Sequence, residues 1–339
     1  MTTTPQRPLP SGFSSTSTTD EVIKGIDLTG KTAIVTGGYG GIGLATVRTL
    51  HDAGAQVIVP ARNTEGARAA LKDLDGVRVE QLDLVEPASV DAFADRFLAE
   101  GRPLHLLINN AGVMATPLTR DARGNELQFA VNHLGHFRLA TRLWPALAAA
   151  GAAGAAGAAD RTGGARVIAL SSRGHRYSPI VFDDLNFEHR TYEPFLAYGQ
   201  SKTANSLFAV ELDRRGRAEG IRAFAVHPGA ILDTDLTRHL SDDALRAAGV
   251  VDVDGRRVLS NGLHVKTVEQ GAATTVWCAT SPALDGLGGV YCEDCDISPV
   301  MTAEELAASD RPLDGPGVLP FAVDQDAATR LWDVSEQLM

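Results

Sequence analysis

Short apolar, β-branched runs alternate along the chain with longer stretches of helical periodicity. The apolar runs are residues 32–36, 57–59, 77–82, 104–109, 167–171 and 223–227, with a weaker one near Val290. The helical patterns between them are residues 42–53, 88–99, 127–149, 195–217 and 268–280. Because such alternation is typical of βαβ units, it predicts an α/β fold. Right-handed crossovers then give a doubly wound parallel sheet of about seven strands with helices on both faces.

The alternation continues to about residue 292 without an internal repeat, so we expect a single domain over residues 28–339. Residues 1–27 are rich in Ser, Thr and Pro, which predicts a flexible tail. A Gly/Ala run at residues 148–159 predicts a frayed helix end and a loose loop. Residues 236–265 are polar and irregular and follow the sixth strand, where α/β proteins place binding lids. We interpret them as a substrate lid.

Composition narrows the classes of partner. The chain has 31 Lys and Arg against 42 Asp and Glu, a net charge of −11, and its basic residues are scattered. A surface for the phosphate backbone of a nucleic acid is therefore not expected. No run approaches the roughly 20 apolar residues of a membrane span, and the first 25 residues resemble neither a signal nor a transit peptide. The sequence predicts a soluble, cytoplasmic protein with no membrane partner.

Cysteine is sparse, with Cys278, Cys292 and Cys295. An odd set of thiols does not build a disulfide framework, and a reducing compartment is the default. Cys292 and Cys295 have the C-x-x-C spacing of zinc and redox motifs, but no second Cys or Cys/His pair accompanies them. We interpret them as structural and expect no metal.

A glycine-rich turn lies between the first strand and the first long helix. It reads Thr36-Gly-Gly-Tyr-Gly-Gly-Ile-Gly43. Glycines in a strand-to-helix turn let the backbone approach a pyrophosphate, and the helix N-terminus supplies amides and positive potential. Tight packing alone is the alternative. The pattern predicts a Rossmann-type dinucleotide site with contacts from Gly37, Tyr39, Gly41, Ile42 and Gly43.

The next strand ends carry further candidates for cofactor contacts. Arg62 ends the second strand, where the NAD fingerprint expects an acid for the ribose 2′-hydroxyl. A guanidinium can hold a 2′-phosphate bidentately, which favours NADP, although NAD with a solvated Arg62 stays open. Asp83 and Leu84 follow the third strand, with Asp83 either an adenine contact or a turn residue. The fourth strand ends in Asn109-Asn-Ala111-Gly112, and we expect Asn109, Ala111 and Gly112 at the same rim.

Tyr198 and Lys202 lie four residues apart in a helical stretch, which places both on one face. An ammonium beside a phenol favours the phenolate and lowers its pKa, so that the tyrosine becomes a usable acid and base. Alone the pair is weak, because the same spacing occurs by chance on solvated helix faces.

Four features follow one another along the chain: the glycine turn, Asn109–Gly112, Ser172 and the Tyr198/Lys202 pair. This is the order found in the short-chain dehydrogenase/reductase family, which the chain strongly resembles from about residue 31 to residue 291. Within the family it is most similar to the retinol-dehydrogenase-like and WW-domain-oxidoreductase-like branch, and to actinobacterial probable oxidoreductases. The segments that carry this likeness are residues 131–137, 226–229 and 328–335.

The resemblance implies a role for each matching position. Tyr198 is the expected proton donor or acceptor, and Lys202 lowers its pKa and holds the nicotinamide ribose. Ser172 hydrogen-bonds the substrate oxygen, and Asn132 positions the water that leads from Lys202 to solvent. Pro228 and Gly229 are expected to contact the cofactor. Local alternatives stay open: Ser172 as a helix N-cap, and Asn132 as a buried polar residue satisfied by backbone.

Three features depart from the family pattern. Twenty-six positions separate Ser172 from Tyr198, and the insert over residues 173–195 is rich in aromatics; it either walls a substrate pocket or packs as a surface hairpin. Tyr39 stands where many NADP-preferring relatives carry a basic residue. Asp233, followed by Thr234, stands where the family has Thr or Ser, which puts a nicotinamide contact by Thr234 in question.

The resemblance implies an NAD(P)-dependent oxidoreductase, with NADP favoured, that transfers a hydride between the cofactor and a small-molecule ketone, aldehyde or alcohol. One alternative is an epimerase or lyase of the same fold that uses the cofactor transiently. Another is a non-catalytic NADP-sensing regulator. The helices at residues 127–149 and 195–217 are candidates for pairing across a two-fold axis in a homodimer or homotetramer.

Overall fold

An eight-stranded sheet forms the centre of the computed structural model, which describes residues 4–155, 164–232, 234, 236, 250–253, 256–259, 265–302, 304–305, 313 and 315–339. The strand order is β10-β9-β6-β5-β4-β1-β2-β3, and every pairing is parallel except that of the edge strand β10. The strands are β1 (Thr32–Val35), β2 (Gln56–Ala61), β3 (Arg78–Gln81), β4 (Leu106–Asn109), β5 (Ala165–Leu170), β6 (Ile221–His227), β9 (Val290–Glu293) and β10 (Asp296–Ile297). The predicted doubly wound sheet and its seven predicted strands are confirmed.

The strand order reverses at β1, which pairs with β2 on one side and with β4 on the other. In open α/β sheets, ligands bind in the crevice beyond the carboxyl ends of the strands at such a switch point. The glycine turn after β1 and the Asn109–Gly112 segment after β4 therefore meet at the edge where a ligand is expected.

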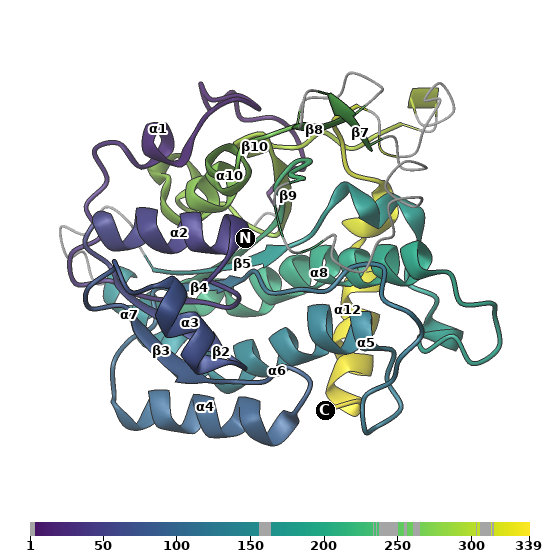
Figure 1. Cartoon of the computed structure of the whole chain (residues 1–339), viewed down its shortest axis with the longest axis horizontal. Helices are drawn as coiled ribbons and strands as arrows, with labels where there is room; N and C mark the ends of the chain where they lie inside the picture. The colour runs from purple at the N-terminus through teal and green to yellow at the C-terminus, as the bar shows by residue number, and fades with distance from the viewer. Residues whose placement is uncertain are drawn as a thin grey trace.

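Helices cover both faces of the sheet (Figure 1). On one face α1, α2 and α10 pack over buried residues of β1, β2 and β6, and on the other α4, α6, α7 and α8 cover a second apolar cluster. The α-helices are α1 (Thr19–Ile23), α2 (Gly41–Asp52), α3 (Thr64–Ala70), α4 (Pro87–Ala99), α5 (Leu127–Phe129), α6 (Gly135–Arg142), α7 (Trp144–Ala155), α8 (Pro194–Gly216), α10 (Val268–Thr280) and α12 (Gln325–Gln337). Short 3-10 turns are η2 (Arg173–Tyr177), η3 (Phe182–Asp184), η4 (Arg217–Glu219), η6 (Pro282–Leu284) and η7 (Pro320–Ala322).

The helix predicted over residues 127–149 is interrupted. It consists of α5, a π-helical turn η1 (Ala130–Leu134), α6 and α7. Pro145 lacks an N–H to continue the helical ladder, which accounts for the break after Arg142. π-Turns are frequent at functional sites, and this one carries Asn132.

The N-terminal segment is packed where we expected a flexible tail. The Gln6 side chain donates to the carbonyl oxygens of Tyr291 (2.7 Å) and Ser298 (2.6 Å), and the Leu9 amide donates to Asp296 (2.7 Å). Val22 of α1 is buried in the cluster beneath α2 and α10. Composition alone did not predict this, because the segment gains its order from partners near the other end of the chain.

The region predicted as a substrate lid falls mostly outside the described residues. Within residues 236–265, the structure shows a two-stranded antiparallel pair, β7 (Val250–Val253) with β8 (Arg256–Leu259), which the sequence did not predict. A bridge between Ala230 and Val265 closes the base of this excursion. Of the Gly/Ala run, residues up to Ala155 continue α7, and residues 156–159 lie outside the described part.

The C-terminal helix α12 lies against α8 and α6 (Figure 1). Its Trp332 ring stacks on Phe208 of α8 at 6.0 Å between ring centres and meets Phe137 of α6 edge-on at 4.7 Å. The guanidinium of Arg215 lies 4.6 Å from the Trp332 ring centre. Part of the two helices considered for a two-fold interface is thus covered by the chain's own C-terminal helix.

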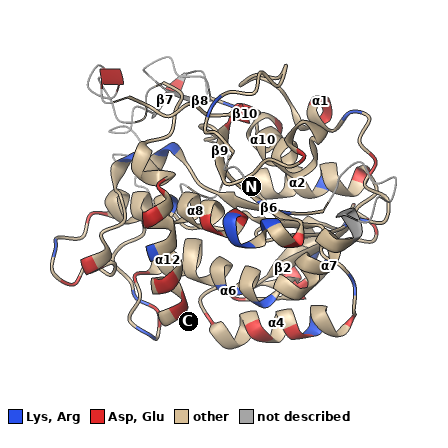
Figure 2. Cartoon of the chain, turned by 180° about the vertical axis from the view of Figure 1, so that it is seen from behind, with Lys and Arg blue, Asp and Glu red and all other residues tan. Residues whose placement is uncertain are grey.

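Acidic residues outnumber basic ones along α4 (Figure 2). Asp91 and Asp95 of this helix pair with Arg138 and Arg142 of α6. Among the described residues, no helix combines the length and apolar character needed to cross a membrane.

The three cysteines are buried and unbridged. Cys292 lies in β9 and Cys295 in the turn that leads to β10, and Cys295 Sγ lies 3.7 Å from Thr274 Oγ1. Among the described residues, no three His, Cys, Asp or Glu side chains gather as metal ligands.

Candidate active site

Helix α8 carries Tyr198 and Lys202 into the interior on one face. Pro194 occupies the first turn, where its missing N–H costs nothing. The Tyr198 side chain is buried, and Lys202 Nζ lies 5.5 Å from the centre of its ring. The chance alternative, a pair on a solvated helix face, does not hold because both side chains are enclosed.

Ser172 follows β5 and approaches the same phenol. Its hydroxyl accepts a hydrogen bond from the Gly174 amide (3.0 Å), so it does cap the short η2 helix. Burial raises the pKa of the Tyr198 phenol, and a hydrogen bond with the Ser172 side chain opposes that rise. Ser172 thus caps η2 and also lies next to the phenol, so the capping interpretation does not exclude a role in the site.

Burial sets the pKa values of the pair, and the expected lowering of the Tyr198 pKa by Lys202 is not seen. Burial raises the pKa of Tyr198 to about 12, against the opposing effect of Ser172. Burial also lowers the pKa of Lys202 to about 7, and its Nζ donates to the Leu170 carbonyl (2.8 Å). Burial disfavours the charged form of both groups. In the chain itself, the Tyr198 phenol is therefore protonated at neutral pH.

The carboxamide of Asn132 is held by three hydrogen bonds. Its Nδ2 donates to the Val113 carbonyl (3.0 Å) and to Ser201 Oγ (2.9 Å), and its Oδ1 accepts from the Val113 amide (2.9 Å). A Cβ placed on Gly112 would lie 3.1 Å from this Oδ1 and 3.6 Å from Lys202 Nζ. Asn132 is thus a satisfied buried polar residue, as the alternative expected, and it also lies beside Lys202 across Gly112.

The backbone of the glycine turn is tightly packed. Gly37 and Gly41 have positive φ angles of 65° and 49°, which glycine adopts without strain. A Cβ on Gly43 would lie 2.5 Å from Asn110 Nδ2, which leaves no room for any other residue. The Asn110 side chain in turn donates to the Thr36 carbonyl (2.8 Å), so the turn after β1 is tied to the segment after β4.

A dinucleotide fits the chemistry of this edge of the sheet. The Asn109 carboxamide is buried, and neither its Nδ2 nor its Oδ1 has a hydrogen-bond partner among the described residues. Helix α2 begins at Gly41 with no side-chain cap, so its first amides are available to an anionic group. Ala111 and Gly112 line the same edge. Ile42 is the second residue of α2, and Tyr39 before the helix is exposed (40%).

Arg62, Asp83 and Leu84 lie at the neighbouring strand ends. Arg62 is exposed beyond β2, and its guanidinium has no ion-pair partner within the described segments. Asp83 Oδ1 accepts from the Val85 amide (3.1 Å), which is the turn role that the sequence left open. The Leu84 carbonyl packs against Gly135 of α6.

The segment after β6 approaches the glycine turn. A Cβ on Gly41 would lie 3.1 Å from Cγ2 of Thr234, whereas Asp233 lies outside the described residues. After Pro228, Gly229 has a φ of 99°, and a Cβ there would meet the Lys266 side chain at 2.6 Å. Lys266 Nζ pairs with Asp294 (2.7 Å), so this loop is pinned to the β9–β10 turn.

The insert over residues 173–195 forms 3-10 turns and irregular backbone rather than a β-hairpin. Tyr192 donates to the Thr116 carbonyl (2.9 Å), and Arg190 lies over the Phe187 ring at 3.7 Å. Tyr177 packs beside Phe195 and close enough to Tyr198 to raise the pKa of that phenol. Most of the insert is packing, and Gly174 and Tyr177 lie beside the phenol.

Two polar residues of this region escaped the sequence analysis. Thr36 Oγ1 accepts from the amides of Asn110 (2.9 Å) and Ala111 (3.0 Å), and it also bonds to His136 Nε2 (2.8 Å). His136 Nδ1 bonds to the Asn132 carbonyl (3.0 Å). A partner 100 positions away leaves no local signal in the sequence.

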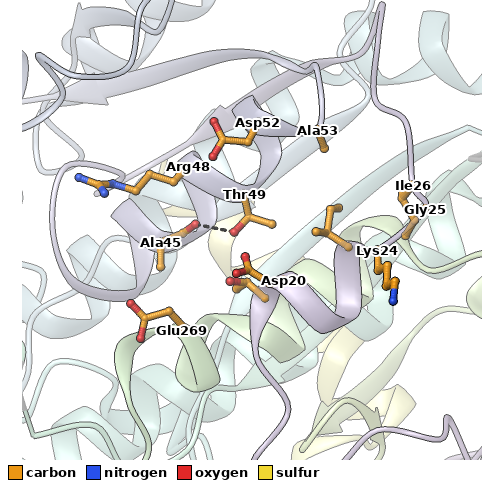
Figure 3. A pocket seen from close by; sticks show the side chains of 12 residues that line it. Asp20, Lys24, Gly25, Ile26, Ala45, Arg48, Thr49, Asp52, Ala53 and Glu269 are labelled. Atoms are coloured by element: carbon orange, nitrogen blue, oxygen red, sulfur yellow. Dashed lines mark hydrogen bonds between the residues drawn. The ribbon is translucent and has the colours of Figure 1, made fainter.

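A pocket of about 420 Å³ lies away from these residues, between α1, the second half of α2 and α10 (Figure 3). Charged side chains of both signs line it, including Asp20, Arg48 and Glu269. None of Tyr198, Lys202, Ser172 and Asn132 contributes to its lining.

Comparison with known proteins places this chain in a family. The sequence profile described as short chain dehydrogenase matches residues 31–179. A probable oxidoreductase of Streptomyces lividans is 43% identical over 91% of this chain and 97% of its own length. Retinol dehydrogenase 11 of Mus musculus is 34% identical over 93% of this chain and 88% of its own length.

A solved structure agrees with these relatives. An uncharacterised protein of Mycobacterium paratuberculosis superposes with a TM-score of 0.66 at 32% identity, over 94% of this chain and 96% of that one. The chain belongs to the short-chain dehydrogenase/reductase family. It is an enzyme of the oxidoreductase class, whose members bind nicotinamide cofactors, and the resemblance seen in the sequence is confirmed.

Proposed function

We propose that the protein is an NADP-preferring oxidoreductase that interconverts a ketone or aldehyde with the corresponding alcohol, using Tyr198 as acid and base. One observation carries this proposal: the Tyr198 phenol is enclosed beside the Ser172 hydroxyl, with Lys202 on the same helix face. These groups lie next to the switch point of the sheet, where the dinucleotide fits.

In reduction, Tyr198 donates its proton to the carbonyl oxygen, and Ser172 hydrogen-bonds the same oxygen. The high pKa of the buried phenol keeps that proton in place at neutral pH. Lys202, whose pKa of about 7 lets it gain or lose a proton near neutrality, returns the proton that Tyr198 gives up and holds the nicotinamide ribose. Asn132 keeps the neighbouring segment at Val113 in place beside Lys202.

The cofactor supplies or accepts the hydride when bound. The amides at the start of α2 and the turn at Gly37, Gly41 and Gly43 are proposed to hold its pyrophosphate. Asn109 offers its unsatisfied carboxamide, and Asp83, Leu84, Ala111, Gly112, Pro228 and Gly229 complete the rim. Arg62, exposed beyond β2, is proposed to bind the 2′-phosphate, which is the basis for preferring NADP over NAD.

The decisive experiment measures NADPH and NADH oxidation against a chemically diverse panel of carbonyl compounds, with Tyr198→Phe as the test variant. Loss of a general acid lowers kcat by about 10²–10⁴-fold, and we expect Tyr198→Phe to do so while its Kd for NADPH stays within twofold. Tyr177→Phe is the matched control, because it removes a neighbouring phenol, and should keep kcat within threefold. An unchanged kcat in Tyr198→Phe would refute the mechanism.

The same assays separate the alternatives. An epimerase or lyase converts substrate without net NADPH consumption, and a regulator binds NADPH tightly with no turnover across the panel. The presence of both Tyr198 and Lys202 in an enclosed site counts against the regulator. An epimerase or lyase keeps the same pair and is distinguished by its lack of net NADPH consumption. We further propose a cytoplasmic location, which the free buried thiols support, and a self-association that does not use the area covered by α12.

A further inference from the structure

Residues 315–319, near the C-terminal end, lie against the turn that follows β5. The guanidinium of Arg176 in this turn donates to the Gly317 carbonyl (2.6 Å). Arg173 donates to the buried carboxylate of Glu293 (3.0 Å), which also accepts from the Gly317 amide. The turn is thus fixed by parts of the chain more than a hundred residues away.

His175 is the direct link between the two segments. Its Nδ1 bonds to the Ser172 carbonyl (2.7 Å), and its Nε2 bonds to the Leu319 amide (3.1 Å). A carbonyl only accepts and an amide N–H only donates, so the partners require a neutral ring protonated at Nδ1. The ring is fully buried, edge-on to Tyr291 at 5.1 Å, and burial lowers the pKa of His175 to about 3.

The direction of the Ser172 hydroxyl depends on the peptide that His175 holds. The Ser172 carbonyl accepts hydrogen bonds from both the backbone amide and the ring of His175. The Ser172 hydroxyl accepts one from the Gly174 amide. Gly174 lies directly against the Tyr198 ring. A rotation of the Ser172 peptide would therefore move its hydroxyl and the backbone that packs on the phenol together.

We propose that His175 is a positioning residue: through its ring, the backbone amide of Leu319 fixes the orientation of Ser172 against Tyr198. The inference rests on the proposed function, because it matters for turnover only where Ser172 and Tyr198 act on the substrate. It adds a C-terminal segment to the machinery, and the contact comes from 144 positions away.

Two substitutions at Leu319 test the link without touching the site. Leu319→Ala removes the side chain and keeps the amide donor, whereas Leu319→Pro removes the donor as well. The φ angle of Leu319 is −75°, which proline adopts without strain. We expect Leu319→Pro to lower kcat at least tenfold below Leu319→Ala, with the Kd for NADPH of both variants within twofold of the parent.

A double-mutant cycle shows whether the effect passes through Ser172. In a Ser172→Ala background, Leu319→Pro should cause no further loss of kcat relative to Leu319→Ala. A full additional tenfold loss there, or equal kcat of the two Leu319 variants in the parent, overturns the inference. Since Tyr198→Phe reports on the chemistry separately, a large effect of that variant with none of Leu319→Pro refutes the positioning role alone.

Variants of His175 keep the test decisive if Leu319→Pro does not fold. His175→Asn can still donate to the Ser172 carbonyl, because its amide nitrogen reaches the place of Nδ1, whereas His175→Phe cannot. We expect kcat to decrease in the order His, Asn, Phe, with at least fivefold between Asn and Phe. Equal kcat for the two variants, at equal binding of NADPH, contradicts the proposal.

Discussion

A Cβ atom added to Gly174 would lie 2.7 Å from Cε1 of Tyr198. That separation is too short for a van der Waals contact. The Tyr198 ring therefore packs directly on the Gly174 backbone, with no space for a side chain between them. The backbone next to Ser172 therefore limits where the phenol can point.

Gly174→Ala should lower kcat at least tenfold by displacing the Tyr198 ring, because the added methyl and the ring cannot both keep their places. The Kd for NADPH should stay within twofold, since Gly174 lies away from the glycine turn. Steady-state kinetics and NADPH fluorescence measure the two quantities. In a Tyr198→Phe background, where the hydroxyl is already gone, the alanine should cost little further activity; an undiminished extra loss would show that it acts elsewhere.

Arg62→Asp should reverse the preference between cofactors. The new carboxylate repels a 2′-phosphate and can accept from a 2′-hydroxyl, so the ratio of kcat/KM for NADPH to that for NADH should fall at least tenfold. Arg62→Lys should keep NADPH ahead. Arg96→Asp, at an exposed arginine of α4, is the control and should leave the ratio within twofold. If Arg62→Asp and Arg96→Asp behave alike, the role of Arg62 is wrong.

Acid should destabilise the protein, because its buried histidines take up protons more readily in the unfolded chain than in the folded one. Burial lowers the pKa of His133 to about 3, whereas an unfolded histidine titrates near 6.5. Below pH 6.5 the unfolded chain therefore binds more protons, and each such histidine lowers the free energy of unfolding by about 1.4 kcal/mol per pH unit down to its folded pKa.

Urea unfolding at pH 7.5, 6.0 and 5.0 measures this loss. His133→Gln can still bond to Ser335, the partner of His133 Nε2 at 2.7 Å, but it does not titrate. As the pH falls, the free energy of unfolding of the variant should decrease less steeply than that of the parent. The two slopes should differ by about the contribution of one bound proton. Parallel curves would place the acid sensitivity in other groups.

Trp332→Ala should destabilise the protein by about 3–5 kcal/mol, because it removes a buried aromatic from between α6, α8 and α12. Loss of this contact also exposes the Phe137 and Phe208 rings, and we expect self-association to increase. Urea unfolding and sedimentation velocity measure the two effects. Trp144→Ala, at a half-buried tryptophan on the edge of the same cluster, should show a smaller loss of stability and no change in association.

The sequence predicted the parts of the fold that repeat and are buried. All seven predicted strands are present. The inner strands are buried on both faces, which demands continuous apolar residues, whereas the edge strand β3 is only half-buried. It missed the strands β7, β8 and β10 and the helices α1, α3 and α12. It also predicted one helix where Pro145 separates α6 from α7, because the apolar pattern continues through the break.

The candidate site was predicted as a set of residues but not as an electrostatic environment. Motifs identified Tyr198, Lys202, Ser172 and Asn132. The structure places Asn132 and Lys202 beside Gly112, and Lys202 and Ser172 near Tyr198. The direction of the Tyr198 pKa could not be predicted, because it depends on how much protein surrounds the phenol. The bond from His175 to Leu319 left no pattern either, since the two residues are far apart in sequence.

The distance along the chain between His175 and Leu319 also has a consequence during synthesis. Ribosomes add about 5–20 residues per second, so the 144 positions between the two partners take roughly 7 to 30 seconds to translate. β5 and helix α8, which carries Tyr198, leave the ribosome during that time, while the turn at Ser172 still lacks its support. The nascent enzyme can therefore acquire most of its sheet well before it can acquire its activity.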